Sequence, residues 1–336
     1  MNIWLICSAR LSLAVAVLSI LTNLLLIFAY FKCPTKSLGS YKLMFLVMAV
    51  FDLFYSLLLG TFCPIFATNK HVLVGISTGL YYQRVAGYIA LASFFVSLLV
   101  AFILVANNFG YRYLLLCRRP HIYIYQTTRG RLMLTSVNTF VTVFWTYFAL
   151  VIMRSDAKLT EMLESFVRTE MELDIWDHGH TALALEDLIS SPMKLVVCSG
   201  ILTTYMMLMI SIGYCTNRIL HMLKNSAMSI ALKRLHRQML VLLLLQLLNP
   251  LISMYGPVII FVIFLVNNFT TPVALSAVMC ALYSIFPLVN PIVMLYFVTD
   301  YRAFIVKRLT RTKSDNVWSN SWNMKASDNK ARPAFS

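Results

Sequence analysis

The chain has 336 residues, of which 60% are hydrophobic and 12% are charged, a composition that leaves too little polar surface for a water-soluble globular protein. The formal net charge is +15, which in a soluble protein would point to a nucleic-acid partner. The basic residues lie in short segments between long apolar stretches, however, so we expect a membrane protein without a nucleic-acid partner.

Seven apolar segments are long enough to cross the hydrocarbon core of a bilayer, which takes about 20 helical residues. These segments are residues 11–31, 43–67, 85–111, 132–153, 195–217, 238–266 and 271–299. Strand-like alternation is absent from them, and lipid offers no partners for open backbone, so all seven are predicted to be helices. The predicted fold is an all-α membrane protein, a seven-transmembrane-helix bundle over residues 1–309 followed by a disordered cytoplasmic tail over residues 310–336.

The basic residues are distributed unevenly between the two sides of this bundle. If the N-terminus is outside, the inner segments hold 21 of the 28 lysine and arginine residues. Positive loops stay in the cytoplasm, so this bias predicts an extracellular N-terminus and a cytoplasmic C-terminus.

Asp52 is the one charged residue inside the seven segments. An ionisable side chain at that depth is costly and suggests a function. Two interpretations remain open: a neutral acid bonded to a neighbouring helix, or a member of a polar, ion-binding cluster with Asn23 in the first span and Asn290 in the seventh.

The third span ends in Tyr111-Arg112-Tyr113, and Arg118 and Arg119 follow in the second inner loop. Arginine at the end of a span either extends its side chain to water or packs between helix ends. Both interpretations place Arg112 at the inner mouth of the bundle.

The long outer segment, residues 154–192, carries nine acidic residues. Its apolar residues at positions 159, 162, 163 and 166 have helical spacing, so we expect a short amphipathic helix that covers the bundle mouth as a lid. His178 and His180 beside Asp177 resemble a metal-ligand set. Solvated polar residues in an acidic loop are the simpler interpretation, and we expect no metal or cofactor.

The sixth span begins with a basic segment that includes Arg234 and Arg237, and it contains Pro250 and Pro257. Each proline removes a helical hydrogen bond and allows a bend. Gln246 lies one turn below the bend, as does Asn249, where an amide can bond to backbone groups that the prolines release.

The seventh span contains Asn290-Pro291 and has no lysine, which excludes a Schiff-base retinal. Residues 300–309 place Tyr301, Phe304, Ile305 and Leu309 on one face and basic residues on the other. This pattern predicts a short amphipathic helix along the inner leaflet after the seventh span.

Several of these motifs together resemble a known family. They are Leu38-Gly39-Ser40-Tyr41-Lys42, Phe51-Asp52-Leu53-Phe54-Tyr55-Ser56, Tyr111-Arg112-Tyr113, Cys117-Arg118-Arg119-Pro120, Arg237-Gln238 with Gln246, Pro250, Tyr255 and Pro257, and Pro287, Asn290-Pro291 and Asp300-Tyr301-Arg302. In this order they are similar to nematode seven-transmembrane chemoreceptors of the Str superfamily, classes r and J, over about residues 20–308. The resemblance implies a G-protein-coupled olfactory receptor in the cell membrane of sensory neurons, with a cilium as its expected location.

The chain departs from the broader rhodopsin-like pattern. Tyr111 stands where an acid usually precedes the arginine, so a local salt bridge to Arg112 is not expected. Gly87 stands where the third span usually has a cysteine, and the acidic outer segment has none, so the usual loop disulfide is missing. Met294 replaces the tyrosine three residues after Pro291.

The resemblance and the residues together lead to a mechanism. We expect a small apolar or volatile ligand in a cavity between the outer halves of spans three, five, six and seven, and a heterotrimeric G protein at the inner mouth. The candidate ligand contacts, found by counting about four turns back from Arg112 and outward from the proline bends, are Phe94, Phe95, Leu98, Tyr255, Cys280 and Ser284. The candidate coupling residues are Arg112, Arg118, Arg119, Arg234 and Arg237. The candidate hinge and activation residues are Asn23, Asp52, Gln246, Pro250, Pro257, Asn290 and Pro291.

Two other functions remain open. A seven-span ligand-gated cation channel of inverted topology would place the basic loops outside, against the charge distribution. A peptide-binding or trafficking receptor would use the acidic outer segment to attract basic peptides. Nucleophile, phosphate-loop and metalloprotease motifs are absent from the sequence, so an enzyme is not expected.

Overall fold

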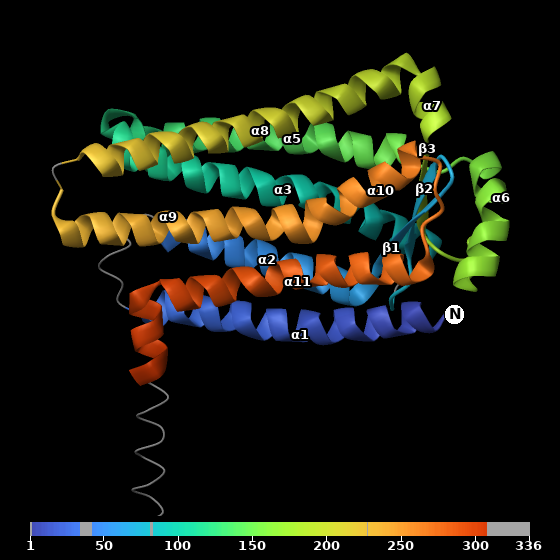
Figure 1. The fold of residues 1–336 in the computed structure, drawn as a ribbon, viewed down its shortest axis with the longest axis horizontal. Helices are drawn as coiled ribbons and strands as arrows, with labels where there is room; N and C mark the ends of the chain where they lie inside the picture. The colour runs from blue at the N-terminus through green and yellow to red at the C-terminus, as the bar shows by residue number, and fades with distance from the viewer. Residues whose placement is uncertain (1, 34–41, 81–82, 227, 308–336) are drawn as a thin grey trace, which may run out of the picture.

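The computed structural model of the chain describes residues 2–33, 42–80, 83–226 and 228–307. Within these residues, seven helices are long and apolar enough to cross a membrane. They are α1 (Ile3–Lys32), α2 (Lys42–Phe62), α3 (Arg84–Cys117), α5 (Thr128–Tyr147), α8 (Pro192–Asn225), α9 (Ile230–Pro250) with its continuation α10 (Gly256–Val266), and α11 (Val273–Phe297). They lie side by side as a bundle (Figure 1), which confirms the predicted seven-transmembrane-helix fold.

The bend in the sixth span is built from a change of helix type. Pro250 ends α9, and the next turn is a π-helix, η5 (Leu251–Tyr255), before α10 starts with Pro257 in its first turn. Because proline has no N–H to donate and its ring crowds the preceding turn, the backbone widens there instead of continuing as a regular α-helix. In Figure 1, α10 diverges from the line of α9.

A small antiparallel sheet stands at one end of the bundle and corrects the expectation that strands are absent. It contains β1 (Pro64–Asn69), β2 (Val72–Ser77) and β3 (His180–Ala184), in that order. The predicted second span, residues 43–67, is therefore wrong at its outer end. Helix α2 stops at Phe62, because Cys63 adopts a left-handed φ of 40° and Pro64 follows it.

The sheet separates the bundle from a cap on the far side of the sheet. Ile65, Val74 and Ala182 pack against Leu163 and other residues of the cap. The cap is formed by α6 (Ala157–Phe166) and the π-helical turn η4 (Val167–Met171), which lie beyond the sheet in Figure 1. The predicted short helix in the lid is therefore present, although Met162, expected on its buried face, is 60% exposed.

The other short elements connect the spans. They are η2 (Arg119–Ile122), α4 (Tyr123–Gln126), η3 (Phe148–Ile152) and α7 (Leu185–Ser190). Residues 299–307 form a helix that lies across the end of the bundle opposite the sheet (Figure 1). Its Tyr301 is fully buried, as the predicted amphipathic pattern requires. Its continuation to residue 309, the tail over 310–336 and the motif over 38–41 lie outside the described residues.

Candidate functional site

A polar network runs through the middle of the bundle and begins at Asp52 on α2, which is 1% exposed. The Nδ2 of Asn290 on α11 donates to both carboxylate oxygens of Asp52, at 3.3 and 3.2 Å. Because an acid at membrane depth is costly without a polar neighbour, this contact explains how the bundle tolerates Asp52. The structure thus brings together two of the three residues that the sequence placed in one cluster.

The network continues to the sixth span through Asn249. Its Nδ2 donates to the Oδ1 of Asn290 at 3.0 Å and to the carbonyl of Phe286 at 2.8 Å. One turn later, the Ser253 hydroxyl donates to the carbonyl of Asn249 at 2.6 Å. The seventh span is therefore bonded to the sixth at its proline bend. Asn249 was expected to bond to backbone groups released by the prolines of its own span, but it bonds to the seventh span instead.

Two of the predicted hinge and activation residues lie differently. Asn23 on α1 does not touch Asp52 but donates to the carbonyls of Ser19 and Pro287, each at 3.0 Å. It reaches Asp52 through hydroxyls, because Ser19 lies 2.7 Å from Ser56, which donates to the Asp52 carbonyl at 2.6 Å. Gln246 is buried, and neither amide atom has a hydrogen-bond partner within the described part of the chain.

The predicted coupling residues that the structure describes lie at the end of the bundle opposite the sheet. Arg112 on α3 is 7% exposed and lies within electrostatic range of His236 on α9. Arg118, Arg234 and Arg237 are exposed, and the Arg119 side chain lies outside the described part of the chain. Arg112 is therefore packed between helix ends, which is one of the two interpretations offered by the sequence. The other described arginines of the predicted coupling set are accessible.

The loop between the third and fourth spans is held against α3 by a tyrosine pair. Tyr125 on α4 packs edge-on against Tyr111, with 5.3 Å between ring centroids, and its hydroxyl donates to the carbonyl of Asn107 at 3.1 Å. Burial raises the pKa of Tyr125 to about 12, so its hydroxyl remains a neutral donor at physiological pH. Tyr111 thus packs against the loop, whereas the acid that usually stands at this position would pair with the arginine.

A groove opens beside these residues between α3 and α8. It has a volume of about 380 Å³, and its lining includes Tyr113, Arg118, Arg218 and His221. A second groove of about 250 Å³ lies between α3 and α5, lined by residues such as Ile103 and Thr139. Both lie away from the predicted outer cavity, whose residues are packed against other side chains.

The predicted outer cavity corresponds to an aromatic cluster. Phe94, Phe95 and Leu98 on α3 are buried in it, and Tyr255 of η5 packs against it and donates from its hydroxyl to the carbonyl of Leu98 at 2.9 Å. Cys280 and Ser284 on α11 face elsewhere: the Ser284 hydroxyl donates to Ser12 on α1 at 2.8 Å. The Cys280 thiol donates to the carbonyl of Pro64 on β1 at 3.1 Å. Four of the six predicted ligand contacts are therefore neighbours, and the other two are bonded to α1 and β1.

Phe66 on β1 belongs to the same aromatic cluster, and sequence reasoning missed it. Its ring centroid lies 5.1 Å from that of Phe94, 5.5 Å from Phe95 and 5.9 Å from Tyr283 on α11. The signal for it was the Cys63-Pro64 break, which ends the helix and makes the following residues a strand with alternating faces.

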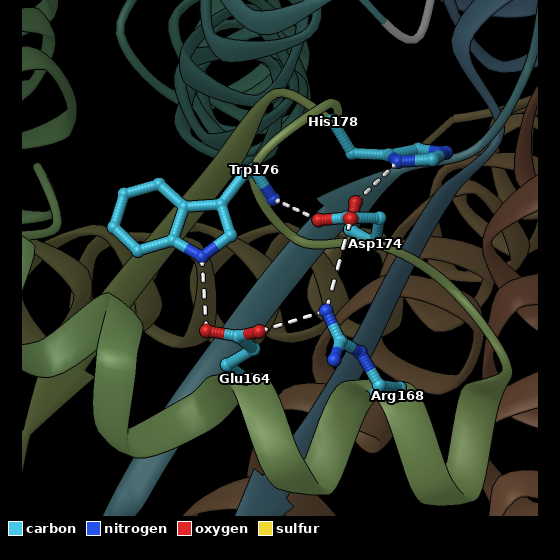
Figure 2. Close-up of polar contacts among 5 residues, drawn as sticks. All are labelled: Glu164, Arg168, Asp174, Trp176 and His178. Carbon is cyan, nitrogen blue, oxygen red and sulfur yellow. Dashed lines mark hydrogen bonds and ion pairs between the residues drawn. The ribbon is translucent and has the colours of Figure 1, made fainter.

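Contacts between the cap and the acidic residues that follow it hold this part of the chain together. Figure 2 shows Arg168 between the carboxylates of Glu164 and Asp174, at 2.8 and 3.9 Å, and Trp176 donating from Nε1 to Glu164 at 3.1 Å. The His178 Nδ1 lies 2.7 Å from the carbonyl of Asp174 (Figure 2). These partly exposed ion pairs contribute little stability individually, but they fold the acidic segment back on itself above the sheet.

His180 connects this cap to the sheet. Its Nε2 lies 3.1 Å from the Thr160 hydroxyl on α6, and its Nδ1 lies 3.0 Å from the carbonyl of His178. Burial lowers the pKa of His180, and the positive charge of Arg84 acts in the same direction. Across the described residues, no group of three or more histidine, cysteine, aspartate and glutamate side chains is arranged to hold a metal ion.

Comparison with known proteins gives one family. The sequence model described as "Serpentine type 7TM GPCR chemoreceptor Str" matches residues 8–306. No curated protein matches the chain. The matched range includes each of the seven long helices from its first or second turn onward, the sheet and the cap.

Proposed function

Because the chain belongs to the Str family of serpentine seven-transmembrane chemoreceptors, we propose that it binds a small apolar or volatile ligand among the outer halves of its helices and activates a heterotrimeric G protein at their inner ends. The N-terminus, sheet and cap are then extracellular, the helix over 299–307 lies on the inner leaflet, and the receptor works in the membrane of a sensory neuron, with its cilium as the proposed site.

The observation that carries this proposal is the network Asp52–Asn290–Asn249, which bonds α2, α11 and α9 together below the bend of the sixth span. It lies between the aromatic cluster and Arg112. A ligand favours one state of a protein only through its different affinity for the two states. Repacking of the aromatic cluster against Tyr255 would act on η5 directly, because Tyr255 is the last residue of that turn.

The consequence at the inner end is exposure of Arg112. Arg112 is buried beside the inner part of α9, so outward movement of α9 would uncover it together with the accessible Arg118, Arg234 and Arg237. A row of arginines is suited to the acidic and carbonyl groups of a Gα subunit. The positive-inside bias of the sequence supports placing this end in the cytoplasm.

The test is receptor-stimulated nucleotide exchange on a Gα subunit in membranes, measured at high receptor density and against an odorant panel. Arg112→Ala is expected to abolish the exchange while the amount of receptor at the cell surface stays unchanged. Arg131→Ala, an exposed arginine of the same loop region, is the matched control and is expected to signal normally. An unaltered dose response in Arg112→Ala would remove Arg112 from the coupling site.

The orientation has its own test. An antibody tag placed after residue 336 is expected to stain only after the cells are permeabilised. Staining of intact cells would instead match the inverted topology of a ligand-gated channel. A peptide receptor that uses the acidic cap is expected to bind basic peptides with a strong dependence on salt concentration, whereas binding of a small apolar ligand should change little with salt.

A further inference from the structure

The residue that carries this inference is Phe66, at the third position of β1. Strand residues alternate between the two faces of a sheet. Ile65 and Ala67 face the cap, and Phe66 faces the bundle with 3% of its surface exposed. The strand thus inserts one aromatic ring into the outer end of the helix bundle.

A glycine in the neighbouring strand leaves space for that ring. Phe66 pairs across the ladder with Gly75 of β2, which pairs with Thr181 of β3, so the three residues form one row on the inner face. A Cβ on Gly75 would lie 2.6 and 2.9 Å from two atoms of the Phe66 ring and 3.0 Å from the Thr181 hydroxyl. The ring therefore occupies the space left by the missing side chain of glycine, and this space continues to the hydroxyl of Thr181.

The surroundings of the ring belong to the spans that the proposed function assigns to the ligand. Besides Phe94 and Phe95 on α3, the ring contacts Tyr283 on α11 and Phe261 on α10, whose centroid is 6.3 Å away. Aromatic rings at these distances attract one another beyond the simple burial of area. The position is therefore a ring-sized site with walls from the third, sixth and seventh spans.

Two buried hydroxyls near this site lack partners. Thr181 and Tyr55 are both fully buried, and within the described residues neither hydroxyl makes a hydrogen bond. Tyr55 stacks on Phe94, at 6.2 Å between centroids, and so borders the same cluster. Buried polar groups are nearly always bonded, so unbonded ones in an apolar site indicate positions for a ligand's polar atom.

We propose that the Phe66 ring occupies the ligand site of the unliganded receptor, and that the ligand is a small molecule with one aromatic or similarly sized ring and one oxygen that bonds to Thr181 or Tyr55. The ligand takes the place of the ring, and Phe66 leaves with its strand. This inference rests on the proposed function and adds the ligand class and the residue that competes with the ligand.

The hairpin is attached to the loop before the seventh span by a pair of threonines that a variant can lock. The Thr68 hydroxyl lies 2.5 Å from that of Thr271, and the Thr271 N–H donates to the Thr68 carbonyl at 2.9 Å. Cysteines at both positions place two thiols where these hydroxyls meet, two residues from Phe66. A disulfide there holds Phe66 in the bundle, and a reductant releases it.

The first experiment compares Phe66→Ala with Ile65→Ala, a buried neighbour on the opposite face of the strand. The probes are benzyl alcohol and toluene, and the readouts are nucleotide exchange on Gα and the melting temperature of the receptor in nanodiscs. We expect Phe66→Ala to respond to benzyl alcohol at a concentration at least tenfold lower than wild type, with a weaker gain for toluene, which lacks the oxygen. Equal potency in the two variants would overturn the inference. Phe66→Leu, which keeps an apolar side chain, is expected to lie between wild type and alanine.

The second experiment uses the Thr68→Cys/Thr271→Cys receptor. In its oxidised form it is expected to lose the response to benzyl alcohol, and the reductant is expected to restore it, while each single variant responds normally. A full response in the oxidised form would overturn the inference.

The melting temperature distinguishes a failure of the Phe66 ring site from a failure of the proposed signalling function. If benzyl alcohol raises the melting temperature of Phe66→Ala above any effect on Ile65→Ala but no variant activates Gα, the ring site stands and the proposed signalling function fails. If the receptors activate Gα with other odorants, but Phe66→Ala gains neither potency nor thermal stabilisation with benzyl alcohol, the function stands and the ring site fails.

Discussion

Asn290 of the seventh span accepts a hydrogen bond at 3.0 Å from Asn249 of the sixth while its own Nδ2 donates to Asp52 of the second. Its side-chain amide therefore uses both polar ends, and three spans depend on the orientation of one residue. A rotation of α9 that removes Asn249 from Asn290 breaks the network at the bend of the sixth span.

Replacing Asn249 with alanine is expected to raise basal signalling, because the sixth span loses its bonds to Asn290 and to the Phe286 carbonyl. The measurement is nucleotide exchange on Gα without ligand, normalised to receptor at the surface. Asn267→Ala is the control, since the Asn267 amide is exposed and donates to the Ile263 carbonyl of its own helix at 2.8 Å. Equal basal activity in the two variants would show that the contact does not restrain the sixth span.

Replacing Asp52 with alanine is expected to lower the free energy of unfolding by about 1–3 kcal/mol, the cost of leaving a buried amide without its acceptor. Asp52→Asn retains an acceptor oxygen for Asn290 and should lose less than half of that. Unfolding of the purified receptor in mixed micelles gives both values. A larger loss for asparagine than for alanine would contradict the contact.

Replacing Gly75 with alanine forces a Cβ against the Phe66 ring at 2.6 Å. Overpacking of this kind costs about 1–3 kcal/mol, so the melting temperature should fall. Gly213→Ala is the matched control, because a Cβ there meets no heavy atom within 4 Å, and alanine favours a helix over glycine. A fall of the same size in both variants would indicate that Phe66 does not fill the space above Gly75.

The contact between the cap and the sheet is expected to weaken in mild acid through His180. Burial lowers its pKa in the folded receptor, while the unfolded chain keeps a value of about 6.5. The unfolded state therefore binds more protons below about pH 6.5. The stabilisation is complete above that pH and is lost as the pH falls toward the lower pKa of the folded state.

The measurement is the melting temperature between pH 7.5 and 5 for wild type, His180→Gln and His178→Gln. Wild type and His178→Gln should lose stability on acidification, and His180→Gln should lose less, because glutamine does not titrate. The neighbouring charged or titratable groups are Arg84 and His178, so Arg84→Gln is expected to reduce the loss as well. An acid response of the same size in His180→Gln would place its origin elsewhere.

The number and order of the spans were predictable because hydropathy measures the property that selects membrane helices. The ends of the spans were less predictable. Helix α8 extends to Asn225, eight residues past the predicted end, because Arg218, His221 and Lys224 interrupt the apolar run without ending the helix. The strand that follows α2 was hidden for the opposite reason. A strand buried on both faces is a continuous apolar run, which on its own resembles the end of a helix.

Part of the site was similarly predictable. Asp52 and Asn290 were predicted to lie together because polar side chains inside spans must find each other. Counting turns placed Phe94, Phe95 and Leu98 correctly beside Tyr255. It failed for Cys280 and Ser284, because the rotation of a helix about its axis depends on its neighbours. Phe66 could not be found by this route, since counting helical turns does not apply to a strand. The sheet that holds it is completed by β3, which pairs with β2 and lies more than 100 residues away from β1.

The most direct test of the account is the distance between the inner ends of the sixth span and the second inner loop. Spin labels on unnatural amino acids at Ile230, which is 88% exposed, and Tyr123, which is 53% exposed, leave the native cysteines in place. Distances are measured by double electron–electron resonance in nanodiscs, with and without nucleotide-free G protein. The account predicts that the G protein shifts the population to distances longer by several ångströms, and that Arg112→Ala prevents the shift. An unchanged distance distribution in a receptor that still binds the G protein would contradict it.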